Sequence, residues 1–183
     1  MNVLVVYESS YGNTHRIADA IGEGLGATHT VTVVPVAKVT KVLLDRVDLV
    51  VVGGPTHIHG MSRTATREKA ADAAHQSGSS LVLDADEGPG LRDWFADLPP
   101  INAYGAAFDT RFDASPLLTG RASKGISKQL RQHGFDEIAE PMSFLVTKES
   151  QLDTGQLDAA HRWGELLADS LTQHADPSRV DNR

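Results

Sequence analysis

The sequence contains no cysteine among its 183 residues. This absence excludes a disulfide framework, thiol catalysis and cysteine-ligated metal or iron–sulfur sites. No apolar run approaches the roughly 20 residues of a membrane span, so we expect no span. The first ten residues have no basic segment and only a short apolar stretch, which is not typical of an export signal. We therefore expect a cytoplasmic protein.

An excess of positive charge is missing as well. The chain has 17 Lys and Arg residues against 24 Asp and Glu residues, a formal net charge of −7. A nucleic-acid surface needs a basic face, so we predict no nucleic-acid partner. Hydrophobic residues make up 40% of the chain, as in an ordinary globular protein. The length predicts one domain over residues 1–173, followed by a frayed polar tail at 174–183.

Apolar, β-branched runs alternate with helical patterns along the chain. Strands are predicted near residues 3–7, 29–34, 48–52, 102–108 and 142–147. Helices are predicted around Ile17 to Leu25 and near residues 39–44, 62–76, 91–98, 120–132 and 155–171, the last capped by Asp153 or Thr154. Residues 77–100 are interpreted as a surface insertion that carries the short helix 91–98.

Alternating strands and helices are typical of an α/β fold with a parallel sheet and helices on both faces. Ligands of such sheets bind at the carboxyl ends of the strands. The informative residues should therefore follow strands one, three and four. Gly53, Gly54 and Pro55 are expected to stop the third strand at this end.

The loop after strand one, Ser9 to Thr14, carries the strongest signal. It places three hydroxyls, an amide and a glycine between a buried strand and a helix, where free N–H groups favour an anion. It matches neither GxxxxGK[ST] nor GxGxxG, and it contains no Lys or Arg. Such neutral donors suit a phosphate monoester that is bound rather than transferred. The alternative from spacing alone is that these side chains only cap the helix.

The stretch YESSYGNTHRIADAIGEGL, residues 7–25, resembles the phosphate-binding loop and first helix of the flavodoxin family. Its Ser-x-Tyr-Gly-Asn-Thr form is similar to the branch that includes the flavodoxin-like quinone reductases. The resemblance implies a three-layer fold, a five-stranded parallel sheet of order 2-1-3-4-5 and a non-covalently bound FMN. It also implies that the ribityl phosphate is held by Ser9, Ser10, Tyr11, Gly12, Asn13 and Thr14.

Two later loops are similar in position to the other flavin loops of that family. In the first, residues 53–61, the paired glycines leave room for a flat ring, and Gly60 is a candidate for a peptide change linked to flavin protonation. A metal at His57-x-His59 is disfavoured without cysteine or a placed carboxylate, and none is predicted. The expected ribityl or ring contacts from the two loops are Pro55, Thr56, His57, Phe108, Asp109, Thr110 and Arg111.

The chain departs from the electron-carrying flavodoxins in two ways. Loop two has no aromatic residue, loop three offers only Phe108 and Phe112, and Trp94 is expected in the core rather than on the flavin. Arg111 near the flavin would favour the anionic reduced form and raise the reduction potential. Both departures add weight to an oxidoreductase acting on a quinone-like acceptor.

A basic stripe is predicted on helix 120–132. Arg121, Lys124, Lys128 and Arg131 share one face, with Ala122, Ile126 and Leu130 on the buried face. The stripe is either a solvated face, or a dock for an acidic partner or for the phosphates of a nicotinamide donor.

Three functions remain open, with an FMN-binding electron-transfer protein serving redox partner proteins favoured. The alternative is an FMN-dependent NAD(P)H:quinone-type oxidoreductase, and the second alternative is a cofactor-free interaction module. A phosphorelay receiver is excluded, because Gly53-Gly54-Pro55 stands where that class needs an aspartate. We assign no catalytic residue, and His57 is the only candidate for proton transfer.

Overall fold

The computed structural model describes residues 1–57, 60–76, 82–84, 88–115 and 119–175. Its strands are β1 (Asn2–Tyr7), β2 (Thr30–Pro35), β3 (Leu49–His57), β4 (Gly60–Met61), β5 (Tyr104–Phe112), β6 (Asp136–Glu137) and β7 (Met142–Val146). Its helices are α1 (Asn13–Gly26), η1 (Val36–Lys38), α2 (Lys41–Leu44), α3 (Thr64–His75), α4 (Leu91–Asp97), α6 (Ala122–Gln132) and α7 (Gln156–His174).

The strands form one sheet of order β2-β1-β3-β5-β6, in which all of these pairs are parallel. The predicted α/β class is thereby confirmed, although the sheet has seven strands rather than five. The predicted fifth strand, residues 142–147, is β7, which pairs with the end of β5. The short strand β6 precedes it, pairs with the start of β5 and is separated from β7 by an interruption. Pro141 lies in the interruption and has no N–H to donate to a ladder. The remaining extra strand, β4, pairs antiparallel with the end of β3.

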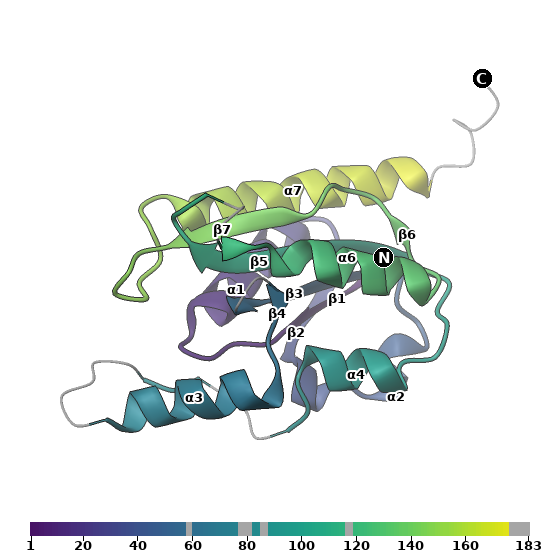
Figure 1. Ribbon diagram of the computed structural model, residues 1–183. Coiled ribbons are helices and arrows are strands. Elements are labelled where there is room, and N and C mark those ends of the chain that lie inside the picture. The colour runs from purple at the N-terminus through teal and green to yellow at the C-terminus, as the bar shows by residue number, and fades with distance from the viewer. Residues whose placement is uncertain (58–59, 77–81, 85–87, 116–118, 176–183) are drawn as a thin grey trace.

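Helices cover both faces of the sheet in three layers (Figure 1). On one face α1 and α7 bury a cluster that includes Ile17, Ile21 and Leu167. On the other face α4 and α6 bury a second cluster, to which Phe95 and Ile126 belong. Because the strands of a parallel sheet are buried on both faces, their sequences are continuous apolar runs. The fold is therefore built around two apolar layers that hold the strand ends in register.

Two strands extend farther than the sequence pattern predicts. β3 does not stop at Gly53 but continues to His57, and β5 continues through Asp109, Thr110 and Arg111 to Phe112. Glycine is required at positions 53 and 54 of this strand because other side chains occupy the space that a Cβ would need. A Cβ on Gly53 would lie 2.0 Å from the Phe108 ring, and one on Gly54 would lie 2.7 Å from Leu91. The expectation that they leave room for a flat ligand ring is thus wrong.

The segment predicted as a surface insertion contributes to the core at its end. In α4, Leu91 and Phe95 are buried, and Leu98 follows them into the same cluster. By contrast, α3 runs along the edge of the molecule (Figure 1), and among its residues only Ala70 is buried. Residues 77–81 and 85–87 of the predicted insertion lie outside the described residues.

The last helix begins and ends slightly differently from the prediction. Gly155, at φ 77°, precedes its first turn in place of Asp153 or Thr154. The helix continues to His174, so the part of the predicted tail that begins at residue 176 lies outside the described residues. None of the described helices is both long and apolar enough to cross a membrane.

Candidate functional site

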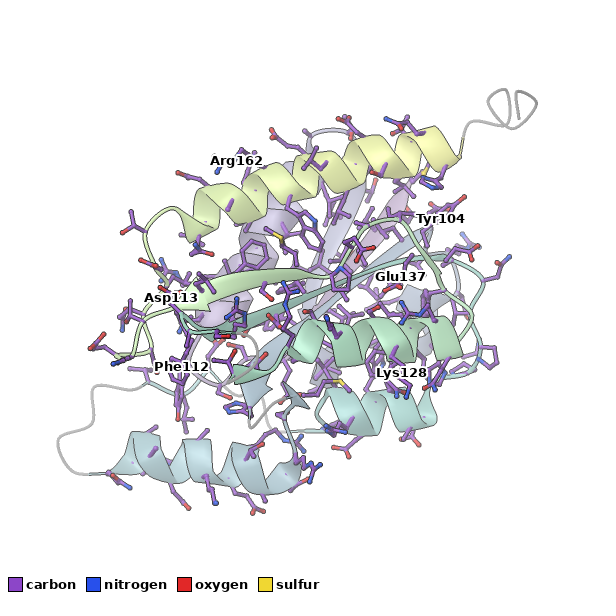
Figure 2. The ribbon with its side chains drawn as sticks, turned by 45° about the horizontal axis from the view of Figure 1, so that its top comes forward. Tyr104, Phe112, Asp113, Lys128, Glu137 and Arg162 are labelled. Carbon is purple, nitrogen blue, oxygen red and sulfur yellow. The ribbon has the colours of Figure 1, made fainter. Side chains whose placement is uncertain are left out.

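The carboxyl ends of β1, β3, β5 and β7 meet at one edge of the sheet. Figure 2 shows Phe112 and Asp113 at this end of the molecule, with Tyr104 and Glu137 at the opposite end. A groove at this edge brings together four segments that the sequence separates widely: the loop after β1, the ends of β3 and β5, and the end of β7 with the turn after it. Its lining residues are Ser10, Tyr11, Asn13, Thr14, Pro55, Thr56, His57, Thr110, Arg111, Phe112, Val146 and Ser150.

The loop between β1 and α1 forms the first wall of the groove. Gly12 has φ 84°, a left-handed conformation that glycine adopts without strain, and its N–H donates to Ser9 Oγ at 3.0 Å. The helix begins at the next residue, so the N–H groups of its first turn have no acceptor within the helix. Ser10 and Thr14 place hydroxyls in the same wall. This geometry offers neutral donors to an anionic group.

Three side-chain bonds hold this loop in place. Thr14 Oγ1 lies 2.8 Å from Thr110 Oγ1 in a buried contact. Asn13 Nδ2 donates to the carbonyl of Ser150 at 2.7 Å. The Tyr11 hydroxyl donates to the carbonyl of Ala70 at 3.1 Å, and burial raises the pKa of this phenol, so it remains a donor. The loop is thus fastened to β5, to the turn after β7 and to α3.

The second wall is the end of β3 with its hairpin partner β4. Thr56 Oγ1 accepts the backbone N–H of Ala122 at 2.9 Å, which ties this wall to the start of α6. His57 Nε2 is buried and has no hydrogen-bond partner within the described part of the chain. Burial lowers the pKa of His57, and the nearby carboxylate of Glu8 raises it less. The imidazole is therefore neutral at pH 7.

The third wall is the end of β5. Arg111 Nη1 donates to the carbonyls of Phe112 at 3.2 Å and Ala114 at 2.7 Å. Its Nε is buried without a partner among the residues described, and Phe112 is 48% exposed beside it. The wall thus carries one cation and one exposed aromatic ring.

Four of the residues expected at the site do not line this groove. Phe108 is fully buried and makes edge contacts with Phe144 and Trp163, 6.1 and 6.3 Å between ring centroids. Asp109 is fully buried, and its Oδ2 accepts the backbone N–H of Ser123 at 2.8 Å. Ser9 lines a separate small cavity instead, and Gly12 lines neither.

Sequence reasoning missed Ser150 and Glu8. Ser150 lines the groove at φ 58°, and its position in the turn after the last strand was the available signal. The carboxylate of Glu8 is buried at the end of β1 and accepts hydrogen bonds from Ser62 Oγ and, at 2.8 Å, from the Leu91 N–H. Glu8 thereby joins β1 to the segments that begin α3 and α4.

The other candidates lie away from the groove. Trp94 is half-buried beside Phe95, with ring centroids 4.8 Å apart, and packs against the core as expected. Among the described residues no three metal-ligating side chains cluster, and His59 lies outside them.

Comparisons with known proteins agree with this geometry. A family model described as a flavodoxin domain matches residues 4–68, from β1 into α3. A solved flavodoxin from the domain Archaea is 23% identical, with a TM-score of 0.64, covering 94% of this chain and 99% of its own. A WrbA-like flavodoxin from Agrobacterium tumefaciens is 22% identical, with a TM-score of 0.55, covering 94% and 98%.

A rubredoxin oxygen:oxidoreductase from Desulfovibrio gigas is 17% identical, with a TM-score of 0.60, and the match covers 96% of this chain but 37% of that larger one. By sequence, no curated protein matches the chain. The chain thus has the flavodoxin fold over nearly its whole length, its first third matches a flavodoxin domain, and the predicted resemblance to the flavodoxin family is confirmed.

Proposed function

We propose that the protein binds FMN non-covalently in this groove and transfers electrons between redox partner proteins. The observation that carries the proposal is the meeting of four strand-end segments at one groove. Its two ends differ in chemistry: neutral hydroxyl and N–H donors at α1, and a neutral imidazole with a cation at β3 and β5. A ligand with a phosphate group on one side and a flat polar ring on the other matches these two ends.

At the α1 end, the chain would hold the phosphate. The N–H groups of the first helical turn and the hydroxyls of Ser10 and Thr14 are the donors. The side chain of Asn13 is occupied by its hydrogen bond to the Ser150 carbonyl. The backbone N–H of Asn13, in the first turn of α1, therefore remains as the donor that this residue offers to an anion. Because no Lys or Arg lies between Glu8 and Thr14, this end binds an anion through hydrogen bonds rather than through a paired charge.

At the other end, the residues fit the edge of a flavin. His57 Nε2 and Arg111 Nε are buried and have no hydrogen-bond partner within the described residues. Each can therefore form a hydrogen bond to a ligand without breaking an existing one, with Arg111 Nε as a donor. Bound FMN would supply the one- and two-electron redox chemistry, and the protein the positioning and electrostatics. As a neutral imidazole, His57 could take up a proton beside the ring and return it from the imidazolium form.

Reconstitution of the purified full chain with FMN tests the proposal. We expect a yellow protein with flavin absorbance between about 350 and 500 nm, quenching of flavin fluorescence and a measurable heat in titration calorimetry. Colourless protein that registers no heat would reject FMN binding and leave the second alternative, a cofactor-free interaction module.

A second candidate function is an FMN-dependent NAD(P)H:quinone-type oxidoreductase. It is favoured by the cation of Arg111 in the groove wall, because a positive charge beside a flavin makes its reduction easier. Steady-state oxidation of NAD(P)H by the FMN-loaded protein with a quinone, and with no second protein present, would support it. If no turnover occurs, the electron carrier is retained.

We further propose that the stripe on α6 docks an acidic redox partner. Lys124 and Lys128 are exposed there, and Figure 2 shows Lys128 on this helix. Arg121 Nε instead donates to Ser143 Oγ at 3.1 Å, and Arg131 pairs with Glu137. Charge reversal of the two lysines should therefore lower a partner's reduction rate at low salt and leave FMN binding unchanged.

A further inference from the structure

An aspartate from outside the predicted loops lies against the phosphate loop. The backbone N–H of Asp84 donates to the carbonyl of Ser10 at 3.0 Å. A Cβ built on Gly12 would lie 3.9 Å from the Asp84 Cβ and 4.0 Å from its carboxyl carbon. A negative charge therefore stands at the loop that offers its donors to an anion.

His15, in the first turn of α1, faces this carboxylate. Its Nδ1 lies 3.2 and 3.1 Å from the two carboxylate oxygens of Asp84. The imidazole stacks on Tyr7 at 4.5 Å between ring centroids, and its Nε2 lies 3.5 Å from the carboxylate of Asp19. The side chains of Asp84 and His15 are 31% and 38% exposed, so water screens the charge of the carboxylate only in part.

Building on the proposed FMN site, we propose that Asp84 is a specificity-determining residue that sets the affinity of the loop for a phosphate group, with His15 holding its carboxylate in place. Like charges repel, and the loop itself has no Lys or Arg. The guanidinium of Arg67, which lines the same small cavity as Ser10 and Asp84, is paired with Asp93. The effect acts on the phosphate and not on the flavin ring. It therefore separates a phosphorylated flavin from an unphosphorylated one.

Two substitutions move the affinity in opposite directions. Asp84→Asn keeps the shape of the side chain and removes its charge, so FMN binds about three- to tenfold more tightly at low salt. His15→Gln leaves the carboxylate without its partner and weakens FMN binding. Riboflavin, which has no phosphate, binds both variants as it binds the unaltered protein. A general loosening of the fold would weaken the binding of both flavins alike, so the ratio of the FMN and riboflavin dissociation constants would not change.

Fluorescence titrations of the apo full chain with FMN and riboflavin measure this ratio at about 20 mM and about 500 mM salt. The matched control is Glu23→Gln, which removes a carboxylate more than two turns farther along α1 and leaves the ratio unchanged. High salt reduces the difference between Asp84→Asn and the unaltered protein. An Asp84→Asn variant that binds both flavins equally more weakly, or that leaves the ratio unchanged, overturns the proposal.

Inorganic phosphate separates this inference from the FMN proposal. Binding to the apo protein is followed by NMR at the amide groups of the loop. If the unaltered protein binds neither flavin, the FMN proposal fails, while tighter phosphate binding by Asp84→Asn still supports the role of Asp84. Equal phosphate affinity in the two proteins, or no phosphate binding by either, contradicts that role.

Discussion

The hydroxyl oxygens of Thr14 and Thr110 lie 2.8 Å apart in a buried contact that joins the first turn of α1 to β5. Thr110→Val keeps the shape of the side chain but leaves the Thr14 hydroxyl without this partner. We expect a loss of about 1–3 kcal/mol in the free energy of unfolding, measured by urea denaturation. Thr110→Ser retains the hydroxyl and should lose less. A Thr110→Val variant as stable as the unaltered protein would show that this contact contributes nothing to stability.

His57 should make the stability of the protein depend on pH. Burial lowers its pKa below the ordinary value, so between the two pKa values the unfolded chain binds the proton and the folded protein does not. Stability contributed by neutral His57 is present above a pH of about 6.5 and is lost as the pH falls below it. Urea denaturation at several pH values should thus show a larger loss in acid for the unaltered protein than for His57→Gln. An NMR titration of the ring that gives a pKa at or above the ordinary value would contradict this assignment.

Arg111→Ala should lower the two-electron reduction potential of the FMN-loaded protein. Arg111 is a cation in the groove wall, and a cation beside the flavin favours the reduced, anionic form. We expect a decrease of about 10–30 mV in a spectroelectrochemical titration. Lys128→Ala, which removes the same charge from the exposed face of α6, should leave the potential unchanged. An unchanged or raised potential in Arg111→Ala would place this guanidinium away from the ring.

Gly53→Ala should destabilise the core rather than act on the ligand. The new Cβ would stand 2.0 Å from the Phe108 ring, which Phe144 and Trp163 hold from two sides. Overpacking of this kind costs about 1–3 kcal/mol, and more where the ring cannot move. Gly26→Ala is the control, because a Cβ there meets nothing within 4 Å. Equal urea midpoints for the two variants would contradict this packing.

Particular residues show how far sequence patterns reach at this site. Tyr11, Asn13 and Thr14 are consecutive or nearly so, and a loop between a buried strand and a helix already predicts where they lie. Phe108 and Asp109 are predicted from the sequence as flavin contacts, but both are fully buried and do not line the groove, because their strand continues and alternation turns the side chains into the layers beside the sheet. No local sequence pattern predicts that a strand stays hydrogen-bonded to its neighbouring strand beyond its apolar run.

Contacts between residues far apart in the chain could not be predicted from the sequence either, because no local pattern marks them. Asp84 meets His15, and Ser150 meets Asn13, across 69 and 137 positions of the chain. Neither pair has a spacing signature, since loops brought together by a sheet need share no periodicity. Glu8 looked like an ordinary turn residue, although it joins three segments through its buried carboxylate.

The sequence by itself determined the alternation of strands and helices, the parallel sheet and the position of the polar loop Ser9 to Thr14 between β1 and α1, because these follow from local periodicity and from side chains adjacent in the chain. Only the tertiary structure decided which side chains share the groove, how far β3 and β5 extend, and that the carboxylate of Asp84 lies against the loop between β1 and α1. Those features depend on strand pairing and on packing between distant segments, whose free energy is gained only when the whole sheet has formed.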